Sequence, residues 1–319
     1  MAAPSVDAVK NIDKLKATFT NITAEIGKKI VGQEDVIEQI IISVLTDSNA
    51  LLESYPGLGK TSMIKAVAET MNLKFSRVQG TPDLMPSDIT GTYVIEEKDG
   101  KKVFKFQRGP LFANIVLVDE INRATPKTQA ALLEAMQEKQ VTVGNQTFEL
   151  DKPFFVLATQ NPIDQEGTYP LPEAQTDRFL LKILVKYPTV DQEIEIVDRY
   201  TKPQEGEQLQ QLLSGESIVL LQKLTRQVPI ANDIKRRAVE IVAKTRNSPE
   251  LIEYGASPRA SLGIVLAAKA KALIDGRKFV SAKDIEDMAL PVLRHRIVLS
   301  FKAERAGKTA DDVIREIMK

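Results

Sequence analysis

The segment Ser-Tyr-Pro-Gly-Leu-Gly-Lys-Thr, residues 54–61, constrains the fold more than any other part of the sequence. It follows a short apolar run at residues 50–52 and precedes a helical pattern at residues 62–71. A glycine-containing loop between a strand and a helix is typical of a phosphate-binding loop in an α/β sheet. In such a loop backbone N–H groups surround a β-phosphate, Lys60 contacts the β- and γ-phosphates, and Thr61 binds Mg²⁺.

The loop departs from the pattern G-x-x-x-x-G-K-[S/T] at its first position, where this chain has Ser54. Serine adopts a positive φ angle less readily than glycine does. If the turn requires a positive φ at this position, Ser54→Gly leaves ATP affinity unchanged or raises it. Taken alone, the octapeptide also fits a glycine-containing turn before an ordinary helix.

Short apolar runs alternate with helical patterns in the first part of the chain, which predicts βαβ units and a parallel sheet. The expected strands are at residues 50–52, 75–78, 115–118, 154–158 and 180–185. Residues 91–108 and 140–152 have the alternating arms and central turn pairs of two β-hairpins. From residue 190 onward only helical periodicity is present. We therefore predict an α/β domain at residues 1–188 and a helical domain at residues 189–319.

Two carboxylates, Asp119 and Glu120, end the apolar run at residues 114–118 and lie 59 residues after Lys60. A carboxylate at the end of a neighbouring strand holds Mg²⁺ in phosphate-binding-loop proteins, which is the role predicted for Asp119. Glu120 is then the residue that orients and polarises the attacking water. Solvated acidic residues also end strands, but the combination with the loop favours the catalytic interpretation. The predicted nucleotide-contacting residues are Ser54, Tyr55, Pro56, Gly57, Leu58, Gly59, Lys60, Thr61, Ser62 and Asp119, of which Thr61 and Asp119 are the magnesium ligands.

Two further polar residues are candidates for the reaction. Asn161 follows the apolar strand and is placed to reach the γ-phosphate or the attacking water, although an Asn before Pro is equally typical of a turn. Arg178 ends a helical stretch before the fifth strand, where it can serve a neighbouring subunit. The alternative for Arg178 is a surface ion pair with Asp177 or Glu173.

These elements, in this order, resemble the AAA+ ATPases, and their detail resembles the MoxR family within that class. The resemblance covers residues 25–319 and departs from the family pattern at Ser54. The matching segments are VGQE (31–34), DLMPSD (83–88), GPLF (109–112), DEINRA (119–124), QAALLEAMQ (129–137), ATQNP (158–162), QEGTYPLPEA (165–174), DRF (177–179) and GASPRA (255–260).

The resemblance implies a parallel sheet of strand order 5-1-4-3-2 with a C-terminal helical lid. It also implies a homo-oligomeric ring, usually a hexamer, that hydrolyses ATP with Mg²⁺ between subunits. Arg178 matches the arginine finger and Arg259 matches the second sensor, acting either in its own subunit or in its neighbour. The hairpins at residues 91–108 and 140–152 match inserts that face the pore or a client protein. Family members act as chaperone-like remodelling factors, and their partners often carry a von Willebrand factor A domain.

Composition restricts the alternatives. The 43 basic and 43 acidic residues give zero net charge, which argues against nucleic acid as a partner and so against a DNA-handling motor. An ATP-gated scaffold with little turnover is a third hypothesis, which Ser54 motivates and Asp119 and Glu120 oppose. The chain has no cysteine and one histidine, so thiolate metal sites and multi-histidine clusters are excluded.

No apolar run approaches the roughly 20 residues that cross a bilayer, so no membrane insertion is expected. The first residues carry no signal-peptide pattern, and the cytoplasm is therefore the expected location. Arg123 either reaches across a subunit boundary or pairs with a nearby acid. His295 is expected to be a surface or packing residue rather than a base, and the lysine-rich run at residues 98–105 to be a solvated hairpin.

Overall fold

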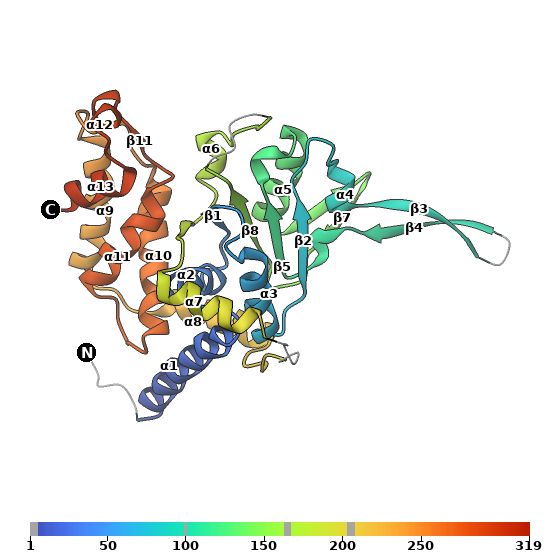
Figure 1. Cartoon of the computed structure of the whole chain (residues 1–319), viewed down its shortest axis with the longest axis horizontal. Helices are drawn as coiled ribbons and strands as arrows, with labels where there is room; N and C mark the ends of the chain where they lie inside the picture. The colour runs from blue at the N-terminus through green and yellow to red at the C-terminus, as the bar shows by residue number, and fades with distance from the viewer. Residues whose placement is uncertain (1–5, 99–100, 163–166, 203–207) are drawn as a thin grey trace.

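A computed structural model describes residues 6–98, 101–162, 167–202 and 208–319, and for residues 6–13 and 98 it describes the backbone alone. A five-stranded parallel sheet lies at the centre, with helices on both faces (Figure 1). Its strands, in the spatial order β2-β5-β8-β1-β9, are β1 (Ala50–Ser54), β2 (Phe75–Gln79), β5 (Ile115–Asp119), β8 (Phe155–Gln160) and β9 (Leu181–Val185). Numbered among themselves, these strands have the order 5-1-4-3-2, so the predicted topology is confirmed.

The interior strand β5 shows why both faces of the sheet are covered. All five of its residues are buried, which is typical of a parallel strand with helices on each side. Leu117 belongs to an apolar cluster that includes residues of α2 (Glu34–Leu45) and α3 (Lys60–Thr70). Its neighbour Val118 belongs to a second cluster that includes residues of α5 (Pro126–Glu138). Adjacent side chains of this strand thus point to opposite faces of the sheet and pack against two different layers of helices.

Further elements complete the sheet region. They are α1 (Val6–Gly27), α4 (Pro86–Thr90), α6 (Glu173–Thr176), α7 (Val190–Tyr200) and two 3₁₀ turns at Pro110–Phe112 and Ile121–Arg123. The N-terminus of α5 is fixed by the Thr125 side chain, which accepts a hydrogen bond from the backbone of Thr128, and by a proline at the first helical position.

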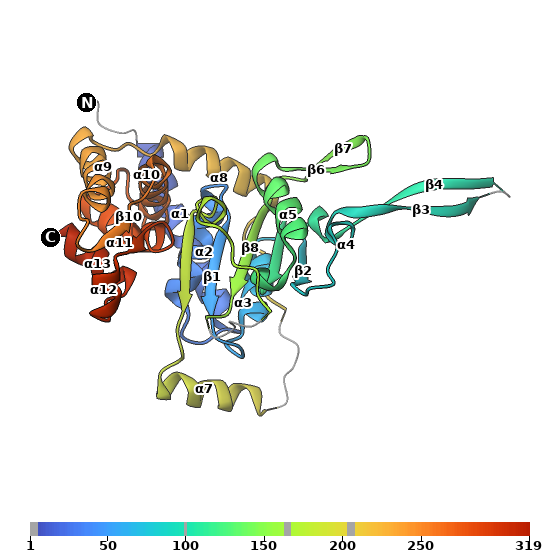
Figure 2. The ribbon, with the colours of Figure 1, turned by 90° about the horizontal axis from the view of Figure 1, so that it is seen from above.

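Both predicted hairpins are confirmed. The first consists of β3 (Gly91–Lys98) and β4 (Lys101–Arg108), and its predicted turn at residues 99–100 lies outside the described residues. The second consists of β6 (Gln140–Val143) and β7 (Gln146–Glu149). Figure 2 shows the first hairpin extending away from the sheet, on the side opposite the C-terminal helices.

The bases of the two hairpins are joined by aromatic side chains. The ring of Phe106 on β4 stacks on that of Phe148 on β7, with 4.3 Å between centroids. The Tyr93 hydroxyl also donates a hydrogen bond to Gln146 at 2.7 Å. Farther along the first hairpin the side chain of Phe104 is 72% exposed, and Lys105 pairs with Glu96. The solvated hairpin expected from the sequence is therefore present.

The C-terminal part of the chain is a helical lid. Its helices are α8 (Gly215–Gln227), α9 (Asn232–Arg246), α10 (Pro258–Ile274), α11 (Ala282–Leu293), α12 (Phe301–Arg305) and α13 (Ala310–Met318). The prediction of helices alone was wrong at one place, where β10 (Ile252–Tyr254) pairs with β11 (Val298–Leu299). Strands of three and two residues are too short to show an alternating pattern.

One buried apolar cluster extends from the sheet into the lid. It contains Ile41 of α2, Leu221 of α8 and Ile264 of α10. The division of the chain at residue 188 therefore stays a prediction, because helices on both sides of it share a core. In the part of the chain that the structure describes, no helix is long and apolar enough to cross a membrane.

The single histidine packs where the lid meets the sheet region. His295 Nε2 lies 3.0 Å from the carbonyl oxygen of Phe179, and Nδ1 is buried with no hydrogen-bond partner among the described residues. Burial lowers the pKa of His295 well below 6.5, and the nearby charges of Arg296, Lys182 and Arg294 lower it further. The expectation of a packing residue is confirmed.

This lowered pKa predicts a pH-dependent stability. Below pH 6.5 the unfolded chain binds a proton at His295 that the folded chain does not bind, so stability falls as the pH falls. We expect the free energy of unfolding to drop by about 1 kcal/mol between pH 7.0 and 5.5 through this group alone. Urea titrations of the wild type and His295→Gln at both pH values measure the difference. An equal pH dependence in the two proteins would contradict the prediction.

Candidate active site

The loop between β1 and α3 forms an open cradle at the carboxyl edge of the sheet. Gly57 and Gly59 have φ angles of +83° and +69°, and the space that a Cβ atom would occupy at each is empty. Gly59 is the N-cap of α3 and provides no side-chain cap for the helix. The first N–H groups of α3 are thus available to an external acceptor, and the helix dipole favours an anion there.

Ser54 lies in the strand before the cradle rather than in its turn. It is the last residue of β1, its side chain is buried, and its hydroxyl donates to the Tyr55 carbonyl at 3.0 Å. The condition for strain at Ser54, a positive φ angle, is therefore not met, because the left-handed positions of the loop are Gly57 and Gly59. Strain at Ser54 thus gives no reason to favour a scaffold with little turnover.

Accordingly, we now expect Ser54→Gly to leave ATP affinity unchanged, with no gain from released strain. The change would lower stability by about 0.5–1 kcal/mol, because glycine loses more backbone entropy when it is fixed in a strand. Isothermal titration calorimetry with ATP and a thermal unfolding curve measure the two effects. A marked rise in affinity would show that the loop is strained at this position after all.

Lys60 leans over the loop from the first turn of α3. Its Nζ atom lies 3.4 Å from the Ser54 carbonyl oxygen and 3.5 Å from that of Tyr55. Both contacts are long for hydrogen bonds, so a phosphate group would compete well for this ammonium group. The cradle and its lysine thus suit a polyphosphate.

Asp119, the last residue of β5, is a buried carboxylate with three neighbouring donors. Thr159 of β8 donates its hydroxyl hydrogen to Asp119 Oδ1 at 2.9 Å. Arg77 of β2 bonds Asp119 Oδ2 through Nε at 2.9 Å and Nη2 at 2.7 Å. A metal bound at this carboxylate would share it with Arg77.

Glu120 follows β5 in the left-handed conformation, with φ +53°. Its backbone N–H donates to the Thr159 hydroxyl at 2.9 Å, and its side chain accepts from Gln79 Nε2 at 3.0 Å. Arg123 forms an ion pair with the same carboxylate at 3.5 Å. Of the two alternatives for Arg123, pairing with a nearby acid is therefore observed, and that acid is Glu120. The carboxylate is therefore held in place from two directions.

Sequence reasoning did not identify Arg77 and Gln79 as site residues. They occupy alternate positions of β2, and the register pairs Gln79 with Asp119 of β5. Two polar side chains at alternate positions near the end of a strand were the available signal, since they share one face. In the sequence, Thr159 stood out only as a member of the family-matching segment ATQNP, with no role assigned to it.

The carboxyl edge brings most of the predicted residues together. Asn161 follows β8 directly, and β8 lies between β5 and β1. The phosphate-binding loop with Lys60 and Thr61, the pair Asp119 and Glu120, and Asn161 therefore share one edge of the sheet, as predicted from strand ends.

Arg178 and Arg259 lie at the opposite edge. Arg178 precedes β9, and the Leu180 N–H bonds the carbonyl of Asn49, the residue before β1. Arg259, in the first turn of α10, lies 3.6 Å from Asp177. The five residues of β1, about 16 Å of strand, separate this edge from the loop. These two arginines therefore lie at the far end of the sheet from the loop of their own chain.

The side chain of Arg178 is exposed and weakly held. Among the described residues its side chain makes one long contact, from Nη1 to the Leu133 carbonyl at 3.4 Å, and forms no ion pair. The alternative of an ion pair with Asp177 or Glu173 is therefore not realised. A pocket of about 240 Å³ lies beside Arg178 and Arg259.

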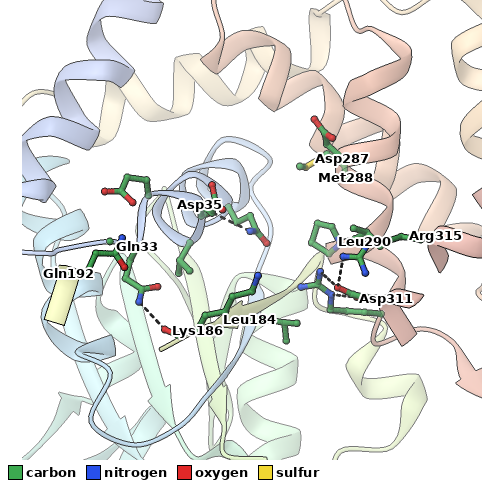
Figure 3. Close-up of a pocket in the computed structure, with 16 residues that line it drawn as sticks. Gln33, Asp35, Leu184, Lys186, Gln192, Asp287, Met288, Leu290, Asp311 and Arg315 are labelled. Atoms are coloured by element: carbon green, nitrogen blue, oxygen red, sulfur yellow. Dashed lines mark hydrogen bonds and ion pairs between the residues drawn. The ribbon is translucent and has the colours of Figure 1, made fainter. Parts of the chain in front are cut away.

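A larger pocket, of about 440 Å³, lies between the start of α2, the end of β9 and the lid (Figure 3). At its rim Gln33 donates to the Lys186 carbonyl at 3.1 Å. The next residue, Tyr187, stacks on Tyr55 of the phosphate-binding loop with 5.2 Å between ring centroids. The pocket therefore adjoins the loop. Polar residues that line it include Gln33, Asp35, Lys186, Asp287, Asp311 and Arg315.

Comparison with known proteins agrees with this arrangement. The family model described as "ATPase family associated with various cellular activities (AAA)" matches residues 49–181, and an AAA lid domain matches residues 244–317. The fold and these matches define an ATPase of the AAA+ class. Two relatives, Chaperone MoxR1 of Mycobacterium tuberculosis and Protein MoxR of Methylorubrum extorquens, are 42% and 29% identical to this chain. The chain belongs to the MoxR family.

The similarity spans nearly the whole chain. The match to Chaperone MoxR1 covers 94% of this chain and 80% of that protein, and the match to Protein MoxR covers 92% and 91%. The uncharacterized protein YeaC of Bacillus subtilis is 43% identical over 92% of this chain and 91% of its own length. A crystal structure from Cytophaga hutchinsonii superposes with a TM-score of 0.90 at 39% identity, covering 98% and 96% of the two chains.

Proposed function

We propose that this protein hydrolyses ATP at the subunit interfaces of a homo-oligomeric ring and uses the energy to remodel, assemble or activate protein complexes. One observation carries the proposal. The groups suited to bind a nucleotide lie at one edge of the sheet, and the two arginines suited to complete its reaction, Arg178 and Arg259, lie at the other. A complete site then requires the carboxyl edge of one subunit and the amino edge of the next.

The residues of the carboxyl edge fit ATP and Mg²⁺. The empty cradle at Gly57 and Gly59 and the uncapped start of α3 suit the phosphates. The Thr61 hydroxyl and the Asp119 carboxylate are the oxygen donors that Mg²⁺ prefers. When bound, the metal neutralises charge on the phosphate oxygens. Lys60 holds the β- and γ-phosphates by charge-assisted hydrogen bonds.

The hydrolytic step falls to Glu120. Its carboxylate accepts a proton from the attacking water, while Gln79 and the Thr159 hydroxyl fix its side chain and backbone. Asn161, at the end of the neighbouring strand β8, orients the water or the γ-phosphate.

The base of the nucleotide has a place as well. The 440 Å³ pocket adjoins the loop through the Tyr55–Tyr187 stack, and it offers both hydrogen-bonding groups and apolar surface. We assign the base and ribose to this pocket, between α2 and the lid helices α11 and α13. Binding there would contact the lid as well as the sheet region.

Arg178 and Arg259 act on the nucleotide of the neighbouring subunit. Both are too far from their own loop to act within one chain, since β1 separates the two edges. A guanidinium group stabilises charge that develops on the γ-phosphate during transfer. For Arg259, for which both subunits were left open, this distance supports the neighbouring subunit, and that is the role we propose.

The chaperone-like role rests on the relatives and on the hairpins. One relative is named a chaperone. The β3–β4 hairpin extends away from the sheet (Figure 2) and carries two exposed apolar side chains, Ile95 and Phe104. Such side chains suit transient contact with a client protein. A hexamer and a partner with a von Willebrand factor A domain are the assembly that we propose, in the cytoplasm and without nucleic acid.

Dilution tests the proposed function directly. ATPase activity per subunit should rise steeply with protein concentration, in step with ring formation measured by analytical ultracentrifugation. Full activity in a demonstrably monomeric sample would exclude a shared site.

Replacement of Glu120 by Gln tests the hydrolytic step. The amide keeps the shape of the side chain but cannot accept the proton, so we expect ATP binding to persist and turnover to fall by about 10²–10⁴. Rings should accumulate in the ATP-bound form. Phosphate release and nucleotide content measure the two quantities, with the exposed Glu134→Gln as control. Undiminished turnover would move the catalytic role to another residue.

A further inference from the structure

Residues of the lid form hydrogen bonds to the chain segment that carries Arg178. The helix α11 ends at Leu293, and the next three residues all direct their side chains to main-chain carbonyls of residues 177–182. Arg294 Nη1 donates to the Lys182 carbonyl at 2.9 Å, and His295 Nε2 lies 3.0 Å from the Phe179 carbonyl oxygen. Arg296 contacts three carbonyls: Nη1 donates to that of Leu180 at 2.9 Å, and Nη2 donates to those of Asp177 at 3.1 Å and Phe179 at 2.6 Å.

Arg296 is the centre of this arrangement. Its side chain is only 4% exposed, and its Nε also donates to Asp177 Oδ1 at 2.7 Å. A buried guanidinium is tolerated when its donors are satisfied, and here they bond three carbonyls around the start of β9 and one carboxylate. A lysine at this position keeps the positive charge, but its single ammonium group cannot bond all the acceptors that surround the planar guanidinium group of Arg296.

Asp177 extends the contact to a second lid helix. The hydroxyl of Ser257 donates to Asp177 Oδ2 at 3.1 Å, and Arg259 lies 3.6 Å from the same oxygen. Ser257 is also the N-cap of α10. One carboxylate, next to Arg178 in the chain, therefore joins the end of α11 to the start of α10.

The backbone and the side chain of Arg178 are held very differently. The preceding residue, Asp177, is bonded as described, and the following residue, Phe179, is fully buried. The side chain of Arg178 itself stays exposed, with one long contact to the Leu133 carbonyl. A fixed backbone with an exposed side chain suits a residue that contacts another molecule from a defined position.

We propose that Arg296 and Asp177 are positioning residues that fix the segment carrying Arg178 to the lid, so that Arg178 and the lid residue Arg259 form one rigid pair. The two guanidinium groups then approach the neighbouring nucleotide together, and a movement of the lid moves both. This inference rests on the proposed role of Arg178 in the neighbouring subunit. Arg296 touches no nucleotide in this arrangement and acts only through the segment that it holds.

A spin label tests the positioning without any catalysis. The chain has no cysteine, so Arg178→Cys provides a single attachment site for a nitroxide. We expect the label to become more mobile when Arg296→Lys is added, because the segment loses its anchor. The control is Arg277→Lys, since Arg277 pairs with Asp284 at the other end of α11. Identical spectra in the Arg296 variant and its parent would overturn the proposal.

Mixed rings test the consequence for hydrolysis. We expect Arg296→Lys to lower kcat by about tenfold or more while the KM for ATP changes little, because its own loop is intact. Mixing with Lys60→Ala subunits should restore turnover, since those subunits bring an intact Arg178 to the intact loop of the variant. A fold that was merely destabilised would not be rescued in this way.

The outcomes separate this inference from the proposed function. Wild-type kcat in Arg296→Lys, together with lost turnover in Arg178→Ala, overturns the positioning role and leaves the shared site intact. Wild-type kcat in Arg178→Ala overturns the shared site, and the spin label alone then decides whether Arg296 holds the segment. If Arg296→Lys does not fold, Asp177→Asn, which keeps the shape and removes the charge, takes its place in both tests.

Discussion

Arg178→Ala is expected to bind ATP almost normally and to hydrolyse it about 10³–10⁵ times more slowly than the wild type. The physical reason lies in the position of the side chain. Arg178 is at the amino edge of the sheet, far from the loop of its own chain, and it is exposed with one long contact to Leu133. Its loss therefore leaves the binding residues intact and removes only charge stabilisation in the neighbouring site. Calorimetry and steady-state phosphate release measure the two effects.

The control for this variant is Arg236→Ala, which removes an exposed arginine from α9 and should leave turnover unchanged. A second control uses complementation. Mixed with Lys60→Ala, the Arg178→Ala protein should recover part of its activity, because one kind of interface then combines an intact loop with an intact Arg178. Loss of ATP binding in Arg178→Ala would show that the residue acts within its own chain, contrary to the geometry.

Lys60→Ala is expected to lose ATP binding, with an affinity about 10²–10³ times lower, the equivalent of two charge-assisted hydrogen bonds. Lys60 supplies the only full positive charge within residues 54–61. In the structure its ammonium group rests on two backbone carbonyls at 3.4 and 3.5 Å and so is available to a phosphate. The remaining backbone N–H groups retain a weak interaction with phosphate.

Calorimetry with ATP measures the loss, and Lys65→Ala is the matched control. Lys65 lies on the same helix, α3, is 63% exposed and pairs with Glu69. The control variant should bind ATP like the wild type. Normal ATP affinity in Lys60→Ala would refute the assignment of the loop, because no other cation of the loop can replace it.

The sheet could be predicted because its interior strands β5 and β8 are largely buried on both faces. The first four residues of β5 are therefore all apolar, and such runs stand out against the helices between them. The edge at which Lys60, Asp119, Glu120 and Asn161 meet also followed from the sequence, since parallel strands present their ends together. The hairpins were visible from their turn pairs, which impose a backbone conformation that few residues adopt.

The rest depended on contacts between distant parts of the chain. Arg77 reaches Asp119 only because β2 pairs with β5 in one register, and nothing within either strand specifies that register. Arg296 lies more than a hundred residues after the backbone that it holds. The backbone conformation of Ser54 was left open for a different reason, because the octapeptide pattern does not show that β1 continues through this residue.

In the shared site that we propose, the separation of the two edges also determines the symmetry of the active assembly. An isologous dimer places the same patch of both subunits against each other, whereas here the two halves of a site face opposite ends of the sheet. Productive contacts are then heterologous, with the head of each subunit against the tail of the next. In an open row of subunits, one terminal loop has no neighbour to supply Arg178, while closure into a circle completes every site. A two-fold symmetric dimer of this chain would be catalytically silent, whatever its stability.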